Sequence, residues 1–182
     1  MLLGKVFCFR TERESSWGAD MKISLKKANI DDFEKIHQMQ ALGFQALLDE
    51  YQDYGTNPGA EALEQIQMRF DYSQIDHYFI MLQDEEIGYI RINSRVDEST
   101  CRLSQMFILP KHQGRGYAQQ AIAQVELLYP QAKCWILDTI KQESKLCHLY
   151  EKMGYKQTGT QKNIKDGMDL IDYAKQVIKW KI

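Results

Sequence analysis

The chain has 182 residues, of which 44% are hydrophobic and 26% charged, so it is long enough to bury one core and has the composition of an ordinary globular domain. Its formal net charge of −2 excludes a global basic field that would attract nucleic acid or an anionic membrane, and neither is expected as a partner. Any bound anion must therefore be held by a local group of donors.

Cysteine usage and hydropathy predict the compartment. The four cysteines are scattered, and neither they nor the histidines have the spacing of a metal site, so we expect free thiols and no metal. No apolar run reaches the ~20 residues of a membrane span. The first residues lack the basic region and the cleavage site of a secretory signal. These features predict a cytoplasmic protein.

Residues 1–20 differ from the rest of the chain, because they end in a polar, aperiodic stretch before Met21 opens a regular pattern. We interpret them as an N-terminal extension, and one hypothesis is that Met21 is the true start. The alternative is a short added strand or arm. Residues 21–182 are predicted to form one domain, since neither a repeat nor a linker interrupts them. The apolar segment 174–182 is expected either to pack across a homodimer interface or to complete its own sheet.

The elements of the first half follow from residue periodicity. Alternation predicts a strand over 22–27, and helical spacing predicts a helix over 28–48. A Gly- and Asn-containing loop comes next, and Asn57 with Pro58 suits the cap and first turn of a second helix. Three strands then follow, the first two as a hairpin, over 77–83, 87–93 and 101–109.

The second half alternates helices and strands. A helix carries an apolar stripe from Ala118 to Leu128, a buried strand covers 133–140, and a helix over 144–153 ends at Gly154. Two strands over 155–161 and 168–178 close the chain. This order mixes strands and helices without strict alternation, so the fold class is α+β with a mainly antiparallel sheet.

The segment 109–126, LPKHQGRGYAQQAIAQVE, runs from a strand through a turn into a helix. Gly114 and Gly116 leave room for amides to converge on one point, and the helix N-terminus adds partial positive charge beside Arg115. The dinucleotide fingerprint fails because position 119 is Gln, and the P-loop pattern is absent. The turn suits a phosphate or pyrophosphate, and the alternative is a plain strand-to-helix connection.

Two motifs carry a family resemblance. Gln113, Gly116 and Ala118 fit the pattern Q/R-x-x-G-x-G/A, and the later segment ILDTIKQESKLCHLYEKMGY ends with the Leu-Tyr-Glu-Lys-x-Gly-aromatic signature. In these motifs and in element order, residues 21–182 resemble the GNAT-family N-acetyltransferases. The resemblance implies the acyl-CoA N-acyltransferase fold: a mixed, mainly antiparallel sheet splayed between strands 4 and 5, with helices on both faces.

The resemblance implies acetyl-CoA as co-substrate, lying between strands 4 and 5. Its pyrophosphate would bind the turn amides, and its pantetheine arm would pair with the end of strand 4 as an added strand. The family often has an Asn where this chain has Glu143, so the pantetheine contact there is in question. The implied cofactor-binding residues are Met106, Phe107, Ile108, Leu109, Gln113, Gly114, Arg115, Gly116, Tyr117, Ala118, Glu143 and Tyr150.

The same resemblance assigns catalytic roles. Tyr150 becomes the general acid for the departing thiolate, with a core tyrosine as the alternative, and an amide near Phe107 or Ile108 becomes the oxyanion donor. Ser104 stands where some members carry a glutamate base. The nearby carboxylates Glu98, Asp138 and Glu143 are the candidates for that base, and for each the alternative is a solvated or structural side chain.

The loop after the first helix is the expected acceptor site. Tyr51, Asp53 and Tyr54 provide negative charge and aromatic faces that suit a cationic amine, with a solvated polar loop as the alternative. The predicted function is N-acetyl transfer from acetyl-CoA to a small-molecule or peptide amine in a ternary complex. Two alternatives remain: a non-catalytic acyl-CoA binding or sensing module on the same fold, and an unrelated phosphate-binding domain.

Overall fold

The structure, a computed structural model, describes residues 22–97 and 99–177. The expectations for the N-terminal extension and for most of the dimer-or-sheet segment therefore lie outside the described residues. Glu98 lies outside them as well.

Within the described residues the observed order of elements is the one that periodicity predicts. The strands are β1 (Ile23–Lys27), β2 (Ile75–Leu82), β3 (Glu85–Asn93), β4 (Thr100–Ile108), β5 (Cys134–Ile140), β6 (Lys156–Lys165) and β7 (Met168–Gln176). The α-helices are α1 (Phe33–Tyr51), α2 (Leu63–Arg69), α3 (Tyr117–Leu128) and α4 (Ser144–Lys152). Short 3₁₀ turns η1 (Ile30–Asp32), η2 (Pro58–Ala60) and η3 (Pro110–His112) precede α1, α2 and α3.

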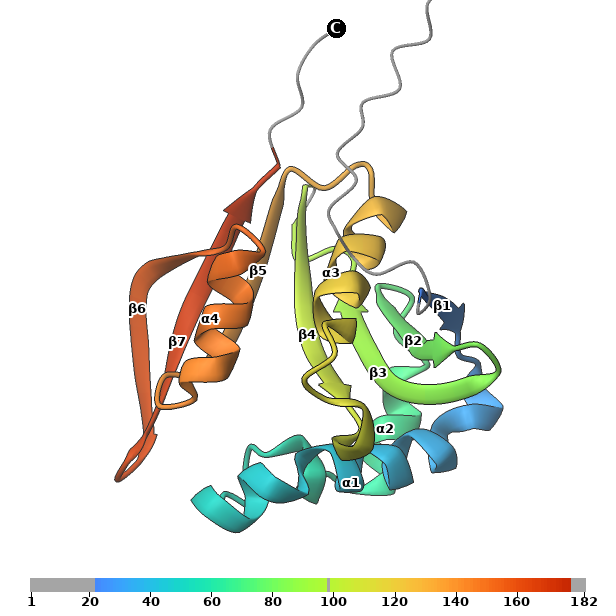
Figure 1. The fold of residues 1–182 in the computed structure, drawn as a ribbon, viewed down its shortest axis with the longest axis horizontal. Helices are drawn as coiled ribbons and strands as arrows, with labels where there is room; N and C mark the ends of the chain where they lie inside the picture. The colour runs from blue at the N-terminus through green and yellow to red at the C-terminus, as the bar shows by residue number, and fades with distance from the viewer. Residues whose placement is uncertain (1–21, 98, 178–182) are drawn as a thin grey trace, which may run out of the picture.

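The seven strands form one mixed sheet in the order β1-β2-β3-β4-β5-β7-β6, in which only β4 and β5 run parallel. These two strands pair over three positions, Thr100–Arg102 against Cys134–Ile136. Beyond Arg102 they diverge and the sheet splits into two arms (Figure 1). We call the unpaired part of β4 and β5 the splayed region, and it confirms the splay that the family resemblance implies.

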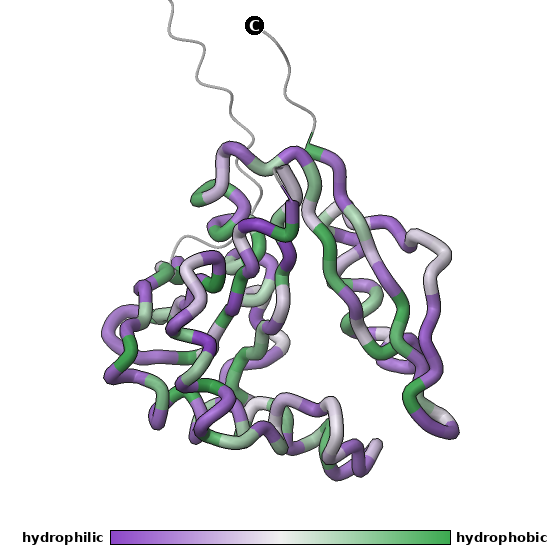
Figure 2. Tube along the Cα trace, turned by 180° about the vertical axis from the view of Figure 1, so that it is seen from behind, coloured by the Kyte–Doolittle hydropathy of each residue, from purple (hydrophilic) through white to green (hydrophobic). Residues whose placement is uncertain are grey.

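Helices cover both faces of the sheet, as expected. Side chains of α3 and α4 join the larger buried cluster, which includes Ile122, Trp135 and Tyr150. Side chains of α1 and α2 join a second cluster with Phe79 and Phe107. The outer strand β6 is exposed along nearly all its length and is mostly hydrophilic (Figure 2). The core therefore lies around β2 to β5 and β7.

The strand β4 supplies residues to both faces. Its pairing with β3 shifts between Arg91 and Ile92, and this irregularity leaves Ser104 as an extra residue. After it, Gln105 and Phe107 face α1, whereas Met106 and Ile108 belong to the α3 side. Alternation along one strand thus places two different surfaces on either side of the splayed region.

Two glycines allow close packing around Phe107. A Cβ on Gly43 of α1 would lie 2.4 Å from the Phe107 ring, and one on Gly88 of β3 would lie 2.4 Å from its carbonyl oxygen. Ordinary Cβ atoms do not approach so closely, so any larger residue would displace α1 or β3 from β4. The position of α1 over β4 depends on these two residues.

Two local expectations are wrong. Asn57 caps the turn η2 through its side chain, 2.7 Å from the amide of Gly59, but Glu61 is extended and α2 begins only at Leu63. Leu128, expected on the apolar stripe of α3, is 50% exposed. The next residue, Tyr129, leaves the helix and takes the buried position, bonded through its hydroxyl to Asp76 at 2.8 Å.

Candidate active site

The glycine turn after β4 forms an uncapped helix N-terminus. Gly114 and Gly116 have φ of +75° and +79°, a region that favours glycine. Gly116 is the N-cap of α3 and offers no side chain to its first amides. Since the first N–H groups of a helix have no acceptor within the helix, the turn directs donors and positive dipole at one place. Arg115 is exposed beside it.

Gln113, the first residue of the turn motif, ties the turn to the strand. Its Nε2 donates to the carbonyl oxygen of Ile108 at 2.8 Å. The side chain is therefore occupied by the end of β4, and the contribution of this residue to a ligand site is through its backbone and through the position it gives the turn.

The end of β4 presents backbone groups to the splayed region. The amide of Leu109 donates to the carbonyl oxygen of Ile87 on β3 at 2.8 Å. Because backbone groups alternate in direction along a strand, Phe107 also faces β3, while Met106 and Ile108 face away from it. Of the two amides expected as the oxyanion donor, that of Phe107 is directed at β3, whereas that of Ile108 is directed away from it.

Tyr150 is a buried residue of α4, 6% exposed, with ring centroids of Tyr155 and Tyr173 at 6.1 and 6.2 Å. Burial, with a smaller contribution from Cys147, raises the pKa of its hydroxyl to about 12. The phenol therefore stays protonated throughout the neutral range and is a hydrogen-bond donor there.

The described carboxylates that were candidates for the base are both engaged. Asp138 on β5 forms an ion pair with Arg102 on β4, where the two strands begin to diverge. Glu143, which precedes α4, accepts a hydrogen bond from the hydroxyl of Tyr51 at 2.7 Å. Neither side chain is a free carboxylate.

The three predicted acceptor residues have different surroundings. Tyr51 bonds Glu143, and its pKa is raised to about 12 by burial and by that bond. Asp53 is 7% exposed, and one carboxylate oxygen accepts from the amides of Gly55 and Thr56, each at 3.1 Å. That carboxylate is used to hold its own turn. Tyr54 is 72% exposed and lines a pocket, whose lining includes neither Tyr51 nor Asp53.

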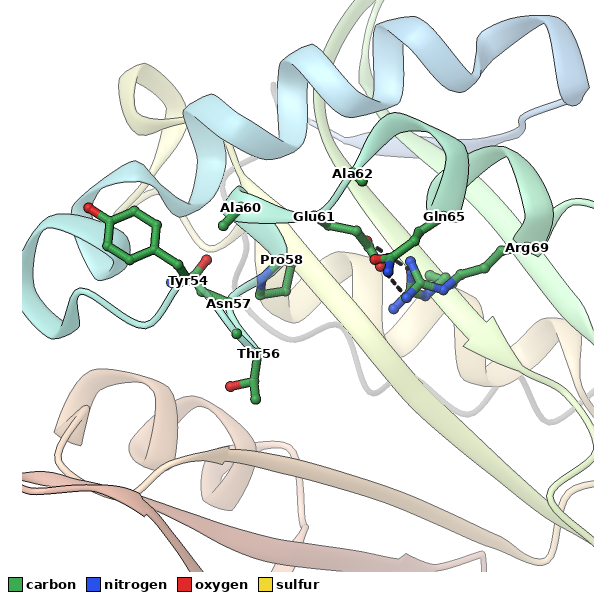
Figure 3. Close-up of a pocket in the computed structure, with 11 residues that line it drawn as sticks. Tyr54, Thr56, Asn57, Pro58, Ala60, Glu61, Ala62, Gln65 and Arg69 are labelled. Atoms are coloured by element: carbon green, nitrogen blue, oxygen red, sulfur yellow. Dashed lines mark ion pairs between the residues drawn. The ribbon is translucent and has the colours of Figure 1, made fainter.

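That pocket has a volume of about 340 Å³ and lies between the α1–α2 connection, α2 and β3 (Figure 3). Tyr54 and Thr56 lie at the loop end, whereas Glu61 and Arg69 lie at the other end beside β3. Arg91 of β3 also lines it. No local sequence pattern joins these charged residues, because Arg91 belongs to a strand that lies well after Glu61 and Arg69 in the chain.

A chain of polar side chains connects α1 and β4 to Glu61, a lining residue of the pocket. Gln40 donates to Glu61 at 3.0 Å and accepts from Gln105 of β4 at 2.6 Å. Glu61 forms ion pairs with Arg69 and, at 3.8 Å, with Arg91. Gln40 is 1% exposed on the apolar face of α1, beside Ile36 and Met39. A polar residue at that helical position was the one sequence signal that could have indicated this network.

The described residues also show whether side chains cluster as in a metal site and whether a helix could span a membrane. Among residues 22–97 and 99–177, no group of three His, Cys, Asp or Glu side chains is arranged to hold a metal ion. In the same part of the chain, every helix is too short or too polar to cross a bilayer.

Both part of the sequence and the fold are similar to those of known acetyltransferases. Residues 74–157 match the family described as acetyltransferase (GNAT) domain. No curated protein sequence matches the chain significantly. An acetyltransferase from Salmonella typhimurium that modifies the N-terminal serine of a ribosomal subunit protein superposes with a TM-score of 0.68 at 15% identity, covering 86% of this chain and 96% of its own.

Two more solved structures share the fold. A spermidine N-acetyltransferase from Vibrio cholerae, in complex with CoA and spermine, has a TM-score of 0.67 at 16% identity over 85% of this chain and 95% of its own. An acetyltransferase from Thermus thermophilus has a TM-score of 0.66 at 16% identity over 86% and 97%. Residues 74–157 therefore match the GNAT acetyltransferase domain, and the chain shares its fold with these acetyltransferases.

Proposed function

We propose that this chain transfers the acetyl group of acetyl-CoA to a primary amine by direct attack within a ternary complex. The observation that carries the proposal is the combination, at the end of one strand, of outward-facing backbone groups on β4 and an uncapped N-terminus of α3. The first suits the amide-bearing pantetheine arm and the second suits the pyrophosphate.

The turn has room for that pyrophosphate. Among the described residues, a Cβ built on Gly114 meets no atom within 4 Å, so the space directly beside this glycine is open. Donors from Gly114 to Ala118 would bind the phosphate oxygens, with Arg115 adding charge. The pantetheine arm would lie along Met106 to Leu109.

The chemistry needs three things from the chain. An alkylamine with a pKa near 10.4 must lose a proton, at a cost of about 4–5 kcal/mol at pH 7. The amide of Ile108 or Met106 would stabilise the oxyanion, and Tyr150 would donate a hydrogen bond to the departing sulfur. Since Asp138 and Glu143 are both engaged, we assign the amine proton to water, and a role for Glu98 stays a prediction.

Thermal unfolding with acetyl-CoA, CoA and ADP tests cofactor binding. Ligand at about 100 times its Kd stabilises by about 2.7 kcal/mol, which raises Tm by several degrees in a domain of this size. We expect a large shift with acetyl-CoA and a smaller one with ADP, followed by thiol release on adding an amine. Folded, CoA-free protein that shows no shift with any of the three contradicts the proposal.

A non-catalytic acyl-CoA binding module is the second candidate. It is favoured by the engagement of Asp138 and Glu143 and by Ser104 at the position of the family's strand-4 base. The two functions differ in one measurement. A module that only binds acetyl-CoA releases no more free thiol when amines are added than when they are omitted.

A further inference from the structure

The pocket beside β3 has an imbalance of charge. Its charged lining residues are Glu61, Arg69 and Arg91, so two guanidinium groups face one carboxylate. The charged parts are poorly solvated, because the side chains of Glu61 and Arg91 are only 9% and 12% exposed. A buried positive charge without an equal negative charge is costly, and a bound anion would remove that cost.

Glu61 has no capacity left to compensate both arginines. One carboxylate oxygen pairs with Arg69, and the other accepts from Gln40 at 3.0 Å. Arg91 reaches that second oxygen only at 3.8 Å, beyond ordinary hydrogen-bond length. Among the described residues, Nη1 of Arg69 is buried without a hydrogen-bond partner. Donors of both arginines are therefore available.

The side chains next to the pocket do not change its excess of positive charge. His77 packs against Phe70 with ring centroids 3.9 Å apart and bonds the Tyr89 hydroxyl through Nδ1 at 2.6 Å. Burial lowers its pKa to about 4, so it is neutral and neither adds to nor offsets the positive charge. Asp53, the other acidic residue of the α1–α2 connection, uses its carboxylate for the turn at Gly55 and Thr56.

The pocket lies on the side of β4 that the proposed cofactor site leaves free. Arg91 is the cross-strand neighbour of Gln105, which faces α1, and Phe107 follows two residues later, roughly 7 Å along the strand. The loop end of the pocket, at Tyr54 and Thr56, is directed toward the arm that contains α4 (Figure 3). An acceptor in this pocket therefore lies within reach of β4 from the face opposite α3.

We propose that this pocket binds the carboxylate of the acceptor, and that the acceptor is a small amine that also carries a carboxylate, as an amino acid does. The fork of a guanidinium matches a carboxylate with two parallel hydrogen bonds. The inference rests on the proposed acetyl transfer and names the substrate class of that site. It replaces the cationic acceptor that the acidic loop residues suggested from sequence.

Matched pairs of amines test the inference with the unaltered chain. L-lysine and cadaverine differ only by the carboxylate, as do L-tyrosine and tyramine, and O-phosphoethanolamine against ethanolamine tests phosphate instead. We expect kcat/KM to be at least about tenfold higher for the carboxylate-bearing member, since charge-assisted hydrogen bonds are the strong ones. Equal rates within the pairs, preference for the decarboxylated amine, or preference for phosphate alone would overturn it.

Variants of the pocket test whether its arginines cause the preference for the carboxylate-bearing amine. Arg91→Gln and Arg69→Gln are each expected to bring the ratio of kcat/KM within a pair close to one, by lowering the rate for the carboxylate-bearing amine only. Glu61→Gln removes the competing negative charge and should raise the ratio, whereas in a pocket for cations it would lower activity toward the diamine. Arg95→Gln, which removes an exposed arginine just after β3, is the matched control and should leave the ratio unchanged.

The failure of this inference can be separated from failure of the proposed function. Absence of any acetyl-CoA-induced rise in Tm removes the proposed function itself. A normal rise together with turnover of amines lacking a carboxylate removes only the assignment of the pocket. A normal rise with no thiol release from either member of any pair removes that assignment and also favours the acyl-CoA binding module over acetyl transfer. The same rise in Tm verifies that each variant is folded, and the ratio in the unaltered chain does not depend on any variant.

Discussion

Tyr150 holds its proton more tightly than a free tyrosine, because burial raises its pKa to about 12. A thiol has a pKa near 8.5, so complete proton transfer to the departing thiolate would cost about 5 kcal/mol. A hydrogen bond to the developing charge avoids that cost. We therefore expect Tyr150 to act as a donor that is not itself deprotonated.

We predict that Tyr150→Phe lowers kcat about tenfold without abolishing it, since one hydrogen bond to a charged group is lost. Because the raised pKa keeps the phenol protonated beyond pH 10, the rate should not fall near pH 10 on account of Tyr150. Steady-state kinetics across pH measures both. Tyr155→Phe, which loses a bond to Glu126 in the same cluster, is the control and should cost stability alone. A Tyr150→Phe rate within twofold of the unaltered chain would reject the role.

His77 gives a second prediction, on stability. Its pKa is about 4 in the folded state against 6.5 in the unfolded state, so between these values the unfolded chain binds a proton that the folded chain does not. The free energy of unfolding therefore falls as pH drops from 6.5 toward 4, by roughly 3 kcal/mol from this residue. Urea denaturation at several pH values should give a flatter dependence for His77→Gln. The exposed His148→Gln control should keep the original slope, and equal slopes in all three would contradict the prediction.

Single residues were predictable from sequence where their role depends on neighbours in the chain. Gly114 and Gly116 lie in a turn, as expected, and Gly154 follows α4 with φ of +88°, as the predicted C′ residue should. Asp53, by contrast, looked like a substrate carboxylate and instead holds a turn. The charges of Glu61 and Arg91 meet only through tertiary contact, which a local pattern does not encode.

At the scale of elements, the turn between β4 and α3 makes the sharpest prediction. Gly114 and Gly167 share a φ of +75°, and a Cβ on either would meet no atom within 4 Å. Alanine at either position should cost similar stability through backbone strain alone, on the order of 1 kcal/mol. Only Gly114→Ala should also weaken acetyl-CoA binding, because its methyl group enters the space assigned to the pyrophosphate.

Calorimetric titration with acetyl-CoA and denaturation of both variants measure the two effects separately. We expect Kd to rise at least about tenfold for Gly114→Ala and to stay unchanged for Gly167→Ala. Equal Kd values for the two variants would show that the turn has no ligand role.

The error at α2 shows how tertiary contact overrides local preference. Asn57 and Pro58 are a proper cap and first turn, and they do start a 3₁₀ turn. The turn stops because Glu61 is extended, with ψ of 136°, which places its carboxylate against Arg69 and Gln40. The start of the turn at Asn57 and Pro58 is a local property that the sequence predicts. The point where the turn stops depends on Gln40 and Arg69, which α1 and α2 bring to Glu61.

At the scale of the whole molecule, two contacts join the arms of the sheet at their open ends. The hydroxyl of Tyr51, at the end of α1, bonds Glu143 before α4 at 2.7 Å. Lys165 at the end of β6 donates to the carbonyl oxygen of Tyr51 at 2.8 Å. The end of α1 thus lies between the arms, under the splayed region (Figure 1).

We predict that Tyr51→Phe lowers the free energy of unfolding by about 1 kcal/mol, the usual net value of one hydrogen bond. Amide exchange should quicken in the last turn of α1 and the first turn of α4 together, since the bond joins them. Tyr72→Phe, at a half-exposed position away from this contact, is the control. Faster exchange in α1 alone would mean that the contact does not couple the arms.

Because β4 and β5 pair over only three positions, a small rotation at this pairing moves the far ends of the two arms by a larger distance. The arms share strand hydrogen bonds only at Thr100–Arg102, and Ile108 lies six residues beyond, roughly 20 Å along the strand. A rotation of about 5° at the join therefore moves the far end by about 2 Å, enough to break hydrogen bonds to anything held there. The fully buried Trp135 lies at this join, in register with Cys101, so a change in packing there is magnified at the far ends of the two strands.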